Sequence, residues 1–176
     1  MTAPRTLVVL QPGYLPWLGF FDQLRRSDVF VYYDDVQFDR HGWRNRNRIR
    51  TASGPLWLTV PVLHAGEPQA INEVVIDNTA HWARKHIGSL KQYYVKAPYA
   101  KRYLPELVHL LSLPWTSLVE LDVAVTALLA GWLGLQRPTI RASSLGIAGA
   151  RSERLIALCN HFGANRYLSE IGRAHV

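Results

Sequence analysis

Arginines occupy every second position of the segment Arg44–Arg50. Successive side chains of an extended segment point to opposite faces, so this spacing predicts one face lined by guanidinium groups. A guanidinium suits two-point recognition of phosphate oxygens. Guanidinium groups at this spacing repel one another unless anions neutralise them. We therefore expect this segment to bind phosphate, and internal neutralisation by Asp34, Asp35 or Asp39 is the alternative.

The residues of this segment that we expect to contact substrate are Trp43, Arg44, Asn45, Arg46 and Arg48. Trp43 adds a ring on which a base could stack, so nucleic-acid binding is a second interpretation. The other basic residues of the chain are scattered rather than gathered into a stripe. The sequence therefore favours a small phosphorylated molecule over nucleic acid as the partner.

A second candidate motif, Gln11–Gly19, lies between a predicted strand and a predicted helix. Ligands of parallel α/β sheets bind outside the carboxyl ends of the strands, and the start of a helix offers free N–H groups to an anion. Gln11 is a candidate catalytic residue, and Tyr14 and Trp17 are candidate substrate contacts. A Gly/Pro turn with packing aromatic residues is the alternative, and position alone does not decide between the two.

Asp34 and Asp35 end the second predicted strand and are the other candidate catalytic residues. Carboxylates at this place can hold Mg²⁺ against a diphosphate, or one of them can act as a general base. Adjacent strand residues point to opposite faces, so we expect one of the two to reach the site. Gln37 is a candidate substrate contact. A structural salt bridge is the alternative for either carboxylate, and Mg²⁺ is the one cofactor that the motif suggests.

The histidines His64, His81 and His86 are candidates for acid–base chemistry, with a structural role as the alternative. His81 and His86 are five residues apart, so they do not share one face of a helix. A single cysteine excludes an intrachain disulfide framework.

Composition predicts a globular protein, because 48% of the 176 residues are hydrophobic and 19% are charged. The net charge of +7 favours anionic partners. The first apolar run is too short for a signal peptide, and the longest one, Val123–Leu135, is too short to span a bilayer. We therefore expect a cytoplasmic protein without a membrane span, and the sequence does not indicate an oligomeric state.

Periodicity predicts strands at Thr6–Leu10 and Val29–Tyr33 on either side of a helix at Pro16–Arg26, which is a βαβ unit with a parallel strand pair. Further extended segments are expected at Arg44–Arg50, Leu56–Val62, Asn72–Asp77 and Pro138–Ala142. Further helices are expected at Thr79–Tyr94, from a Ser117 capping box to about Leu133, and after a Ser152 cap with Leu155, Ile156, Cys159 and Phe162 on its inner face. Pro98 and Pro105 would bracket irregular or short helical structure. The alternation predicts an α/β, Rossmann-like layered fold with a mostly parallel sheet.

Taken together, these segments resemble the WbqC-like protein family. The stretches that carry the resemblance are QPGYLPWLGFFDQL (11–24), SDVFVYYDDVQF (27–38), WRNRNRIR (43–50), WLTVPV (57–62), INEVVIDN (71–78), KAPYA (96–100) and SERLIALCNHFGANRYLS (152–169). The N-terminal motifs are highly specific, and the likeness runs in order along the chain to Ser169.

This resemblance implies a setting, since the family is associated with gene clusters for bacterial surface polysaccharides and some specialised metabolites. In that setting we expect a transferase that acts on a phosphate- or diphosphate-activated substrate, such as a nucleotide-sugar, with a small amine or amino acid as a candidate nucleophile. The alternative is a noncatalytic module that binds nucleotide-sugar or nucleic acid. An enzyme should gather polar residues of all three motifs into one pocket, whereas a nucleic-acid binder should present an open basic groove.

The last residues, Glu170–Val176, match one reading frame of a common short-read sequencing adapter. Members of the family usually continue with glycine after the segment that resembles Tyr167–Ser169, where this chain has Glu170. We therefore interpret residues 170–176 as an artefact, and residues 1–169 as a single domain that is incomplete at its C-terminus.

Overall fold

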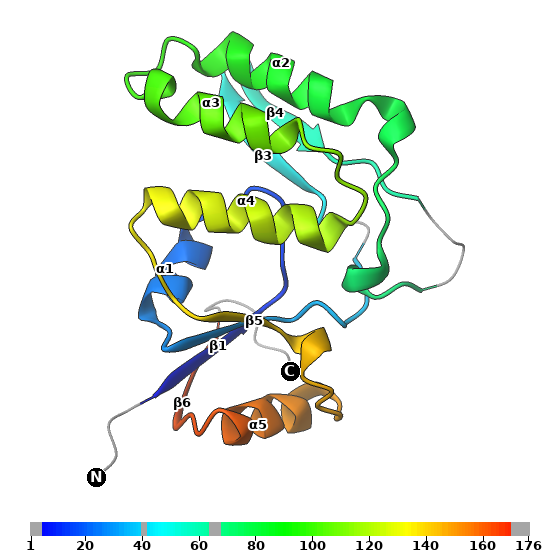
Figure 1. Cartoon of the computed structure of the whole chain (residues 1–176), viewed down its shortest axis with the longest axis vertical. Coiled ribbons are helices and arrows are strands. Elements are labelled where there is room, and N and C mark those ends of the chain that lie inside the picture. Colours follow the sequence, from blue (N-terminus) through cyan, green and yellow to red (C-terminus); the bar gives the residue numbers. More distant parts are fainter. Residues whose placement is uncertain (1–4, 40–41, 64–67, 170–176) are drawn as a thin grey trace. The chain divides into compact units, whose positions relative to one another are not determined.

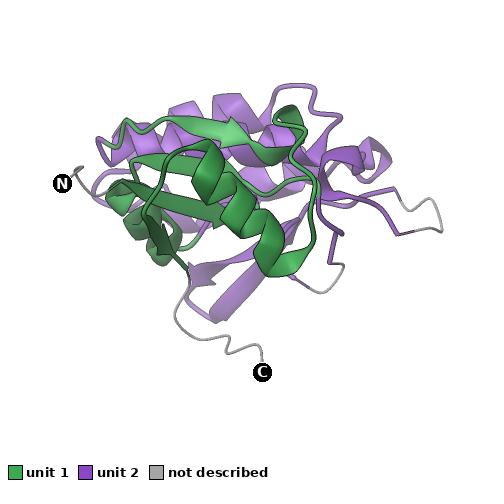
Figure 2. Cartoon of the chain, turned by 90° about the horizontal axis from the view of Figure 1, so that it is seen from below, with its two compact units in different colours: residues 1–11, 17–35, 135–176 green, residues 12–16, 36–134 purple. Residues whose placement is uncertain are grey.

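The computed structural model of the chain describes residues 5–39, 42–63 and 68–169 (Figure 1). It forms two compact units, coloured separately in Figure 2. Unit 1 consists of residues 1–11, 17–35 and 135–176, and unit 2 of residues 12–16 and 36–134. The interpretation of residues 1–169 as one domain stays a prediction. Residues 170–176, assigned above to an adapter, lie outside the described residues, and so does His64.

Unit 1 is built on a four-stranded sheet with the order β5-β2-β1-β6. Its strands are β1 (Thr6–Leu10), β2 (Val29–Tyr32), β5 (Thr139–Arg141) and β6 (Arg166–Leu168). Every neighbouring pair in this order is parallel. The β1–β2 register, from Leu7 opposite Val29 to Leu10 opposite Tyr32, confirms the predicted βαβ opening and the α/β, Rossmann-like layered fold.

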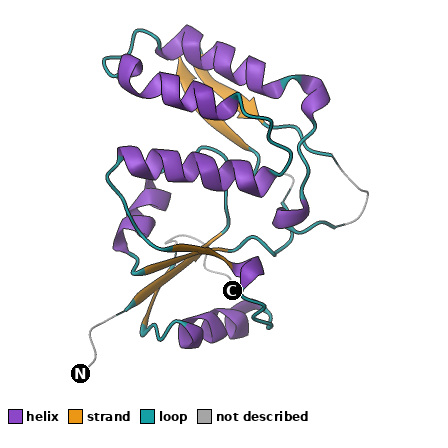
Figure 3. Cartoon of the chain, viewed as in Figure 1, coloured by secondary structure: helices purple, strands orange, loops and turns teal. Residues whose placement is uncertain are grey.

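Helices pack on both faces of the central strands β1 and β2, which are apolar on both sides. Helix α1 (Leu18–Arg26) places Phe20 against Phe30, with the ring centroids 5.1 Å apart. Helix α5 (Arg151–His161) packs Leu158 against the alternate residues of β1 and β2. Along the chain α1 follows β1 and α5 follows β5, so strands and helices alternate as in a layered α/β unit (Figures 1 and 3).

From β1 the sheet grows in one direction through β2 and β5 and in the other direction through β6. The strand order therefore reverses between β1 and β6. In open α/β sheets, ligands bind at such a reversal, outside the carboxyl ends of the strands. The carboxyl end of β1 leads into Gln11, and that of β2 leads into Asp34 and Asp35. The topology therefore supports the expected location of these two motifs.

Unit 2 combines an antiparallel hairpin with three α-helices. The hairpin strands are β3 (Arg46–Thr51) and β4 (Gly54–Thr59), and the helices are α2 (Trp82–Tyr94), α3 (Ala100–Leu111) and α4 (Leu118–Trp132). Their shared core includes Ile49, Leu58, Leu90, Leu111, Leu121 and Val125. Among the helices described in both units, none has the length and apolar character needed to cross a membrane.

One expected element of unit 2 is wrong. Asn72–Asp77 is not a strand: Ile71–Glu73 forms a 3-10 helix, and this stretch makes isolated bridges only. Its turn is favoured because the Glu73 carboxylate accepts a hydrogen bond from Ala70 N at 3.0 Å. The stretch between Pro98 and Pro105, expected to be irregular or short helical structure, is helical from Ala100, and α3 continues through Pro105, with Leu107 and Leu111 buried further along it.

One predicted helix start is confirmed and one differs. Ser117 is the N-cap residue of α4 as predicted, although its side chain forms no cap hydrogen bond. Helix α5 begins at Arg151, so Ser152 lies inside the helix rather than capping it. The inner face of α5 is also shifted: Ile156 is 59% exposed, whereas Leu158 is fully buried.

The shifted face of α5 gives a matched test. Leu158→Ala should lower the free energy of unfolding by about 2–5 kcal/mol, because it leaves a cavity beneath the sheet. Ile156→Ala on the same helix should change it by less than about 0.5 kcal/mol, because that side chain already faces solvent. Urea unfolding of both variants measures the difference, and a larger loss for Ile156→Ala would refute the placement of α5.

Candidate functional site

The loop after β1 is hydrogen bonded to the arginine segment within unit 2. Tyr14 N donates to Arg44 O at 3.0 Å, and Arg44 Nη1 donates to Pro12 O at 3.2 Å. The Asn47 amide donates to Leu15 O at 2.6 Å. The structure thus brings residues of the Gln11–Gly19 motif and of the arginine segment together.

Two backbone features of this loop depend on that contact. A Cβ at Gly13 would lie 3.0 Å from Trp43 O, so a larger residue would push the loop away from the segment. Leu15 adopts a φ of 49°, a left-handed conformation that is costly for a branched side chain. Such strain persists only where the surroundings hold it, and the Asn47 amide does so here by binding Leu15 O.

Tyr14 is fully buried and anchors a polar cluster in unit 2. Its hydroxyl lies 2.9 Å from His86 Nδ1, and His86 Nε2 lies 3.1 Å from Thr59 O. A carbonyl can only accept, so Nε2 carries the proton and Nδ1 accepts from the tyrosine. Burial lowers the pKa of His86 to about 4, which keeps the ring neutral near pH 7. A direct substrate contact by Tyr14 stays a prediction.

Asp122 of α4 belongs to the same region, although its sequence context gave it no role. It is fully buried, and neither carboxyl oxygen has a hydrogen-bond partner among the described residues. Burial raises its pKa well above the usual value, and the charge of Arg44 acts in the opposite direction. Burial, followed by the charge of Asp122, also raises the pKa of Tyr14. Tyr14, His86, Arg44 and Asp122 therefore form one electrostatically coupled group.

The predicted alternation of β3 is confirmed. Ile49 is buried in the core of unit 2, whereas Arg48 and Arg50 are exposed on the opposite face. The register places Arg48 opposite Trp57 of β4. An aromatic residue thus joins the arginine face, and it was not among the predicted site residues.

Four side chains stack on this exposed face, and we call them the Trp–Arg cluster: Trp43, Arg46, Arg48 and Trp57. The indole centroids are 5.2 Å apart, with 33° between the ring planes. Arg48 Cζ lies 5.3 Å from the centroid of each indole, and Arg46 Cζ lies 4.9 Å from that of Trp57. Guanidinium groups over indole faces gain cation–π attraction. Both indoles nevertheless remain 45% exposed.

Ion pairs show whether carboxylates of the protein neutralise the arginine face, which was the alternative to phosphate binding. In the described part of the chain, neither Arg48 nor Arg50 forms an ion pair with a carboxylate. Asp34 and Asp35 pair instead with arginines of unit 1. The exposed face of β3 therefore keeps positive charge that these two carboxylates do not offset.

Both carboxylate oxygens of Asp34 accept hydrogen bonds within unit 1. Its Oδ2 accepts from Arg141 Nε at 2.6 Å and from Ser143 Oγ at 2.7 Å, and its Oδ1 accepts from Ser143 N at 2.9 Å. The side chain is completely buried. These bonds join the carboxyl ends of β2 and β5, which is the salt-bridge alternative considered for this residue.

Asp35 is placed differently. Its Oδ2 pairs with the guanidinium of Arg154, which lies 5.0 Å over the Tyr33 ring. The hydrogen bond from Asp35 raises the pKa of Arg154. Asp35 Oδ1 is buried and has no hydrogen-bond partner among the described residues. Of the two adjacent carboxylates, Asp35 is thus the one with an uncommitted oxygen.

The remaining candidates lie apart from these clusters. Gln11 is partly buried at the end of β1, and Trp17 is exposed just before α1. Gln37 is exposed and bridges to Ala70, whereas Asn45 is buried and its amide donates to Val60 O at 2.8 Å. Gln11, Trp17, Asp34 and Asp35 belong to unit 1, and Tyr14, Gln37, Trp43, Arg44, Asn45, Arg46 and Arg48 belong to unit 2. That they line one cleft stays a prediction.

No group of three or more His, Cys, Asp or Glu side chains that could hold a metal occurs in residues 5–39, 42–63 and 68–169. Mg²⁺ is usually held by one or two carboxylates together with water and substrate phosphates. A role for Mg²⁺ therefore stays a prediction that rests on Asp35.

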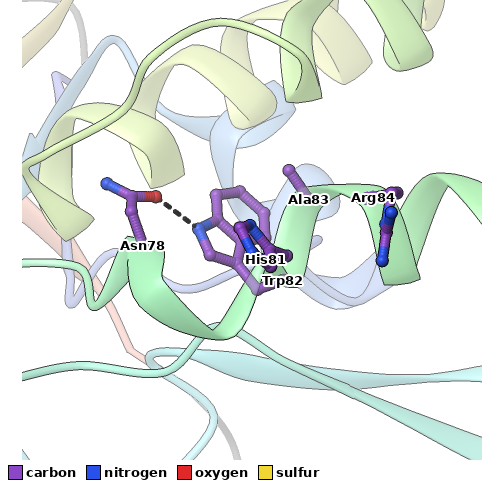
Figure 4. A pocket seen from close by; sticks show the side chains of 5 residues that line it. All are labelled: Asn78, His81, Trp82, Ala83 and Arg84. Carbon is purple, nitrogen blue, oxygen red and sulfur yellow. Dashed lines mark hydrogen bonds between the residues drawn. The ribbon is translucent and has the colours of Figure 1, made fainter.

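A surface pocket of about 290 Å³ opens at the start of α2 in unit 2 (Figure 4). Its lining includes His81, Arg84 and Asn78, whose Oδ1 accepts from Trp82 Nε1 at 3.0 Å. None of the residues from the three motifs lines it, so it adds no support to the predicted site.

Trp57 and Asp122 were not among the predicted site residues, although each had a signal in the sequence. Trp57 follows from a hairpin register centred on the two residues Ala52 and Ser53, a signal that was present in the spacing of the strands. Asp122 lies four residues after the buried Leu118 and three before the buried Val125, so helical spacing alone puts it on the inner face.

Comparison with known proteins agrees with these motifs. The model of the WbqC-like protein family matches residues 11–176. The chain belongs to the WbqC-like protein family. A relative described as the uncharacterized protein Rv1507c, from Mycobacterium tuberculosis (strain ATCC 25618 / H37Rv), is 34% identical over 167 residues, which cover 94% of this chain and 72% of that protein. No solved structure matches this WbqC-like protein.

The burial of Asp122 predicts a distinctive dependence of stability on pH. Because its folded pKa is raised, the folded state binds more protons than the unfolded state above pH 4, and this contribution to stability is lost as pH rises. Asp122→Asn removes the effect. Between pH 4 and 6.5 the variant should therefore gain stability relative to the wild type by up to about 1.4 kcal/mol per pH unit.

Urea unfolding at several pH values measures this gain, and Glu120→Gln is the matched control. Glu120 is an exposed carboxylate on the same helix, so its amide variant should follow the wild-type curve. Burial lowers the pKa of His86 and gives a pH dependence of opposite sign in the same range, so the comparison is between variants rather than absolute slopes. Parallel curves for Asp122→Asn and the wild type would show that Asp122 ionises in the folded protein.

Proposed function

We propose that this WbqC-like protein is a cytoplasmic transferase that acts on a phosphate- or diphosphate-activated substrate in the synthesis of bacterial surface polysaccharides or specialised metabolites. One observation carries the proposal: Arg48 is exposed, forms no ion pair with a carboxylate of the described residues, and is held over two indole rings. A fixed guanidinium of this kind is suited to bind an anionic leaving group.

The geometry of a guanidinium allows both contacts at once. Indole rings attract the flat face of the group, whereas its N–H donors lie in the plane. Stacking on Trp43 and Trp57 therefore restrains the side chain of Arg48 without using its donors. A restrained donor fork loses less conformational entropy when it binds phosphate oxygens in the bidentate manner.

Transfer would proceed by displacement of the phosphate-bearing group. The lone pair of a small amine or amino acid forms a bond to the activated carbon, the bond from that carbon to the phosphate oxygen breaks, and the phosphate leaves with the electron pair. Asp35 accepts the proton that the nucleophile loses, because its Oδ1 is not otherwise hydrogen bonded among the described residues. Arg44, Arg46 and Arg48 neutralise the leaving group, and Gln11 hydrogen bonds the substrate. Tyr14, Trp17, Gln37, Trp43 and Asn45 complete the proposed substrate-binding set.

The role of Arg48 can be tested by binding alone. Arg48→Gln should weaken the affinity for inorganic diphosphate by about 10- to 150-fold, which corresponds to the loss of a charged hydrogen-bond partner, about 1.5–3 kcal/mol. Titration calorimetry measures the affinity. Arg25→Gln is the control, because it removes the same charge from an exposed helix position that already pairs with Asp22. Equal weakening in both variants, or no diphosphate binding by the wild type, would contradict the proposal.

The role of Asp35 requires a turnover assay. The wild type should release nucleoside diphosphate from at least one member of a panel of nucleotide-sugars when an amino-acid mixture is supplied. Asp35→Asn should slow this release by about 100-fold or more, as expected when a general base is lost. Affinity for inorganic diphosphate should change little, because the arginines remain.

For this assay, Asp22→Asn is the control, since Asp22 is an exposed carboxylate of unit 1 whose ion-pair partners in the described residues are Arg25 and Arg26 of its own helix. Unchanged turnover in Asp35→Asn would exclude its role as the base. Tight nucleotide-sugar binding by the wild type without any product would indicate a binding module instead of a transferase.

A further inference from the structure

We infer that the Trp–Arg cluster is a stacking platform for the base of a nucleoside diphosphate, so that the activating group of the substrate is a nucleotide. This inference rests on the proposed function, because it assigns the nature of the activated substrate to the same arginine face. It adds a residue, Trp57, that the predicted site did not contain.

The cluster presents the two surfaces that a nucleotide requires. The two indoles lie in a tilted pair with 5.2 Å between their centroids, and each stays 45% exposed. The exposed part of each indole offers aromatic surface to a further flat ring. Arg46 and Arg48 lie 4.9–5.3 Å from the same ring centroids, which sets cationic groups directly beside the aromatic surface. A base with an attached diphosphate matches this pairing of aromatic and cationic groups.

The hairpin is anchored in the core of unit 2 by other side chains than these indoles. Its opposite face is anchored in the core by Ile49 and Leu58, and Asn45 is hydrogen bonded to Val60 O at 2.8 Å. Two large rings that stay half exposed contribute less to folding than buried rings, because only the area removed from water counts. Their exposed surface is what a bound base would cover.

Other ligands use only part of the cluster. A simple or lipid-linked diphosphate would bind the guanidinium groups but leave the indoles exposed. A neutral sugar would not neutralise the charge of the guanidinium groups. Single-stranded nucleic acid binds along grooves that offer successive stacking positions. Here one ring lies on β4 and the other just before β3, with 5.2 Å between their centroids, which suits a single base better than a row of bases.

Calorimetric titration of the full chain with uridine diphosphate, guanosine diphosphate and inorganic diphosphate tests this inference. At least one nucleotide should bind the wild type about fivefold or more tightly than inorganic diphosphate, the gain expected from stacking one base. Trp57→Leu should abolish this difference, and it should weaken the binding of inorganic diphosphate less than that of the nucleotide, because Trp43 still stacks on Arg48. Trp57→Phe should retain part of it, because a smaller aromatic face remains.

Tyr99→Leu is the matched control, since Tyr99 is an exposed aromatic residue of the same unit that lies outside the cluster and contacts Tyr103. It should preserve the preference for nucleotide. Thermal melts of each variant establish that it is folded, and Trp57→Phe provides the readout if Trp57→Leu fails to fold.

The remaining outcomes separate the two proposals. If all three ligands bind the wild type equally and Arg48→Gln weakens them all, the base platform is wrong while the proposed function stands. If none binds, both fail. Equal losses of nucleotide and inorganic diphosphate in Trp57→Leu would show that the indole only positions the arginines, which overturns the platform. Binding of a hexauridylate tenfold or more tightly than any mononucleotide would also overturn it in favour of single-stranded nucleic acid.

Discussion

The hydrogen bonds between the loop at residues 12–16 and the segment 44–47 fix the polar chemistry of unit 2. Because Tyr14 N and Pro12 O are both bonded to Arg44, the loop cannot shift without moving the arginine segment. The same attachment turns the Tyr14 side chain inward to His86 and keeps Arg44 near Asp122. A loop that reads in sequence as a flexible Gly/Pro turn is therefore a fixed part of the candidate site, and Gly13 is required for the close approach.

The distribution of charge follows from which carboxylates the arginines meet. Asp34 and Asp35 follow β2 and are bound by Arg141 and Arg154, which come from β5 and α5 of the same unit. These pairs stabilise the carboxyl edge of the sheet, but they leave the exposed face of β3 without those two partners. Stacking on indoles offsets part of the repulsion between its guanidinium groups. The remaining positive charge is the physical reason to expect an anionic ligand there.

The sequence predicted features that depend on local periodicity. The parallel β1–β2 pair and the alternation of β3 follow from apolar runs and period-two spacing, and both are confirmed. Features that depend on side-chain hydrogen bonds or on distant partners were missed. Apolar spacing in Asn72–Asp77 suggested a strand, but the Glu73 side chain favours a turn there. Helical spacing puts Asp122 on the inner face of α4, but its proximity to Arg44 requires the folded arrangement of unit 2, and no local pattern specifies the partners of Asp34.

The two adjacent aspartates show how a fold can separate a structural residue from a candidate catalytic one. Both residues lie beyond the end of β2, where Asp34 N donates to Tyr32 O at 3.0 Å, and their side chains meet different partners. Asp34 meets Arg141 and both donors of Ser143, and its two oxygens are thereby occupied. Asp35 meets Arg154 through one oxygen only, and the other stays buried without a partner in the described residues. A buried acceptor of this kind is costly unless a water, an ion or a substrate binds it. Asp34 is unsuitable as a base because both of its oxygens accept hydrogen bonds, whereas Asp35 keeps one oxygen that can accept a proton from a substrate.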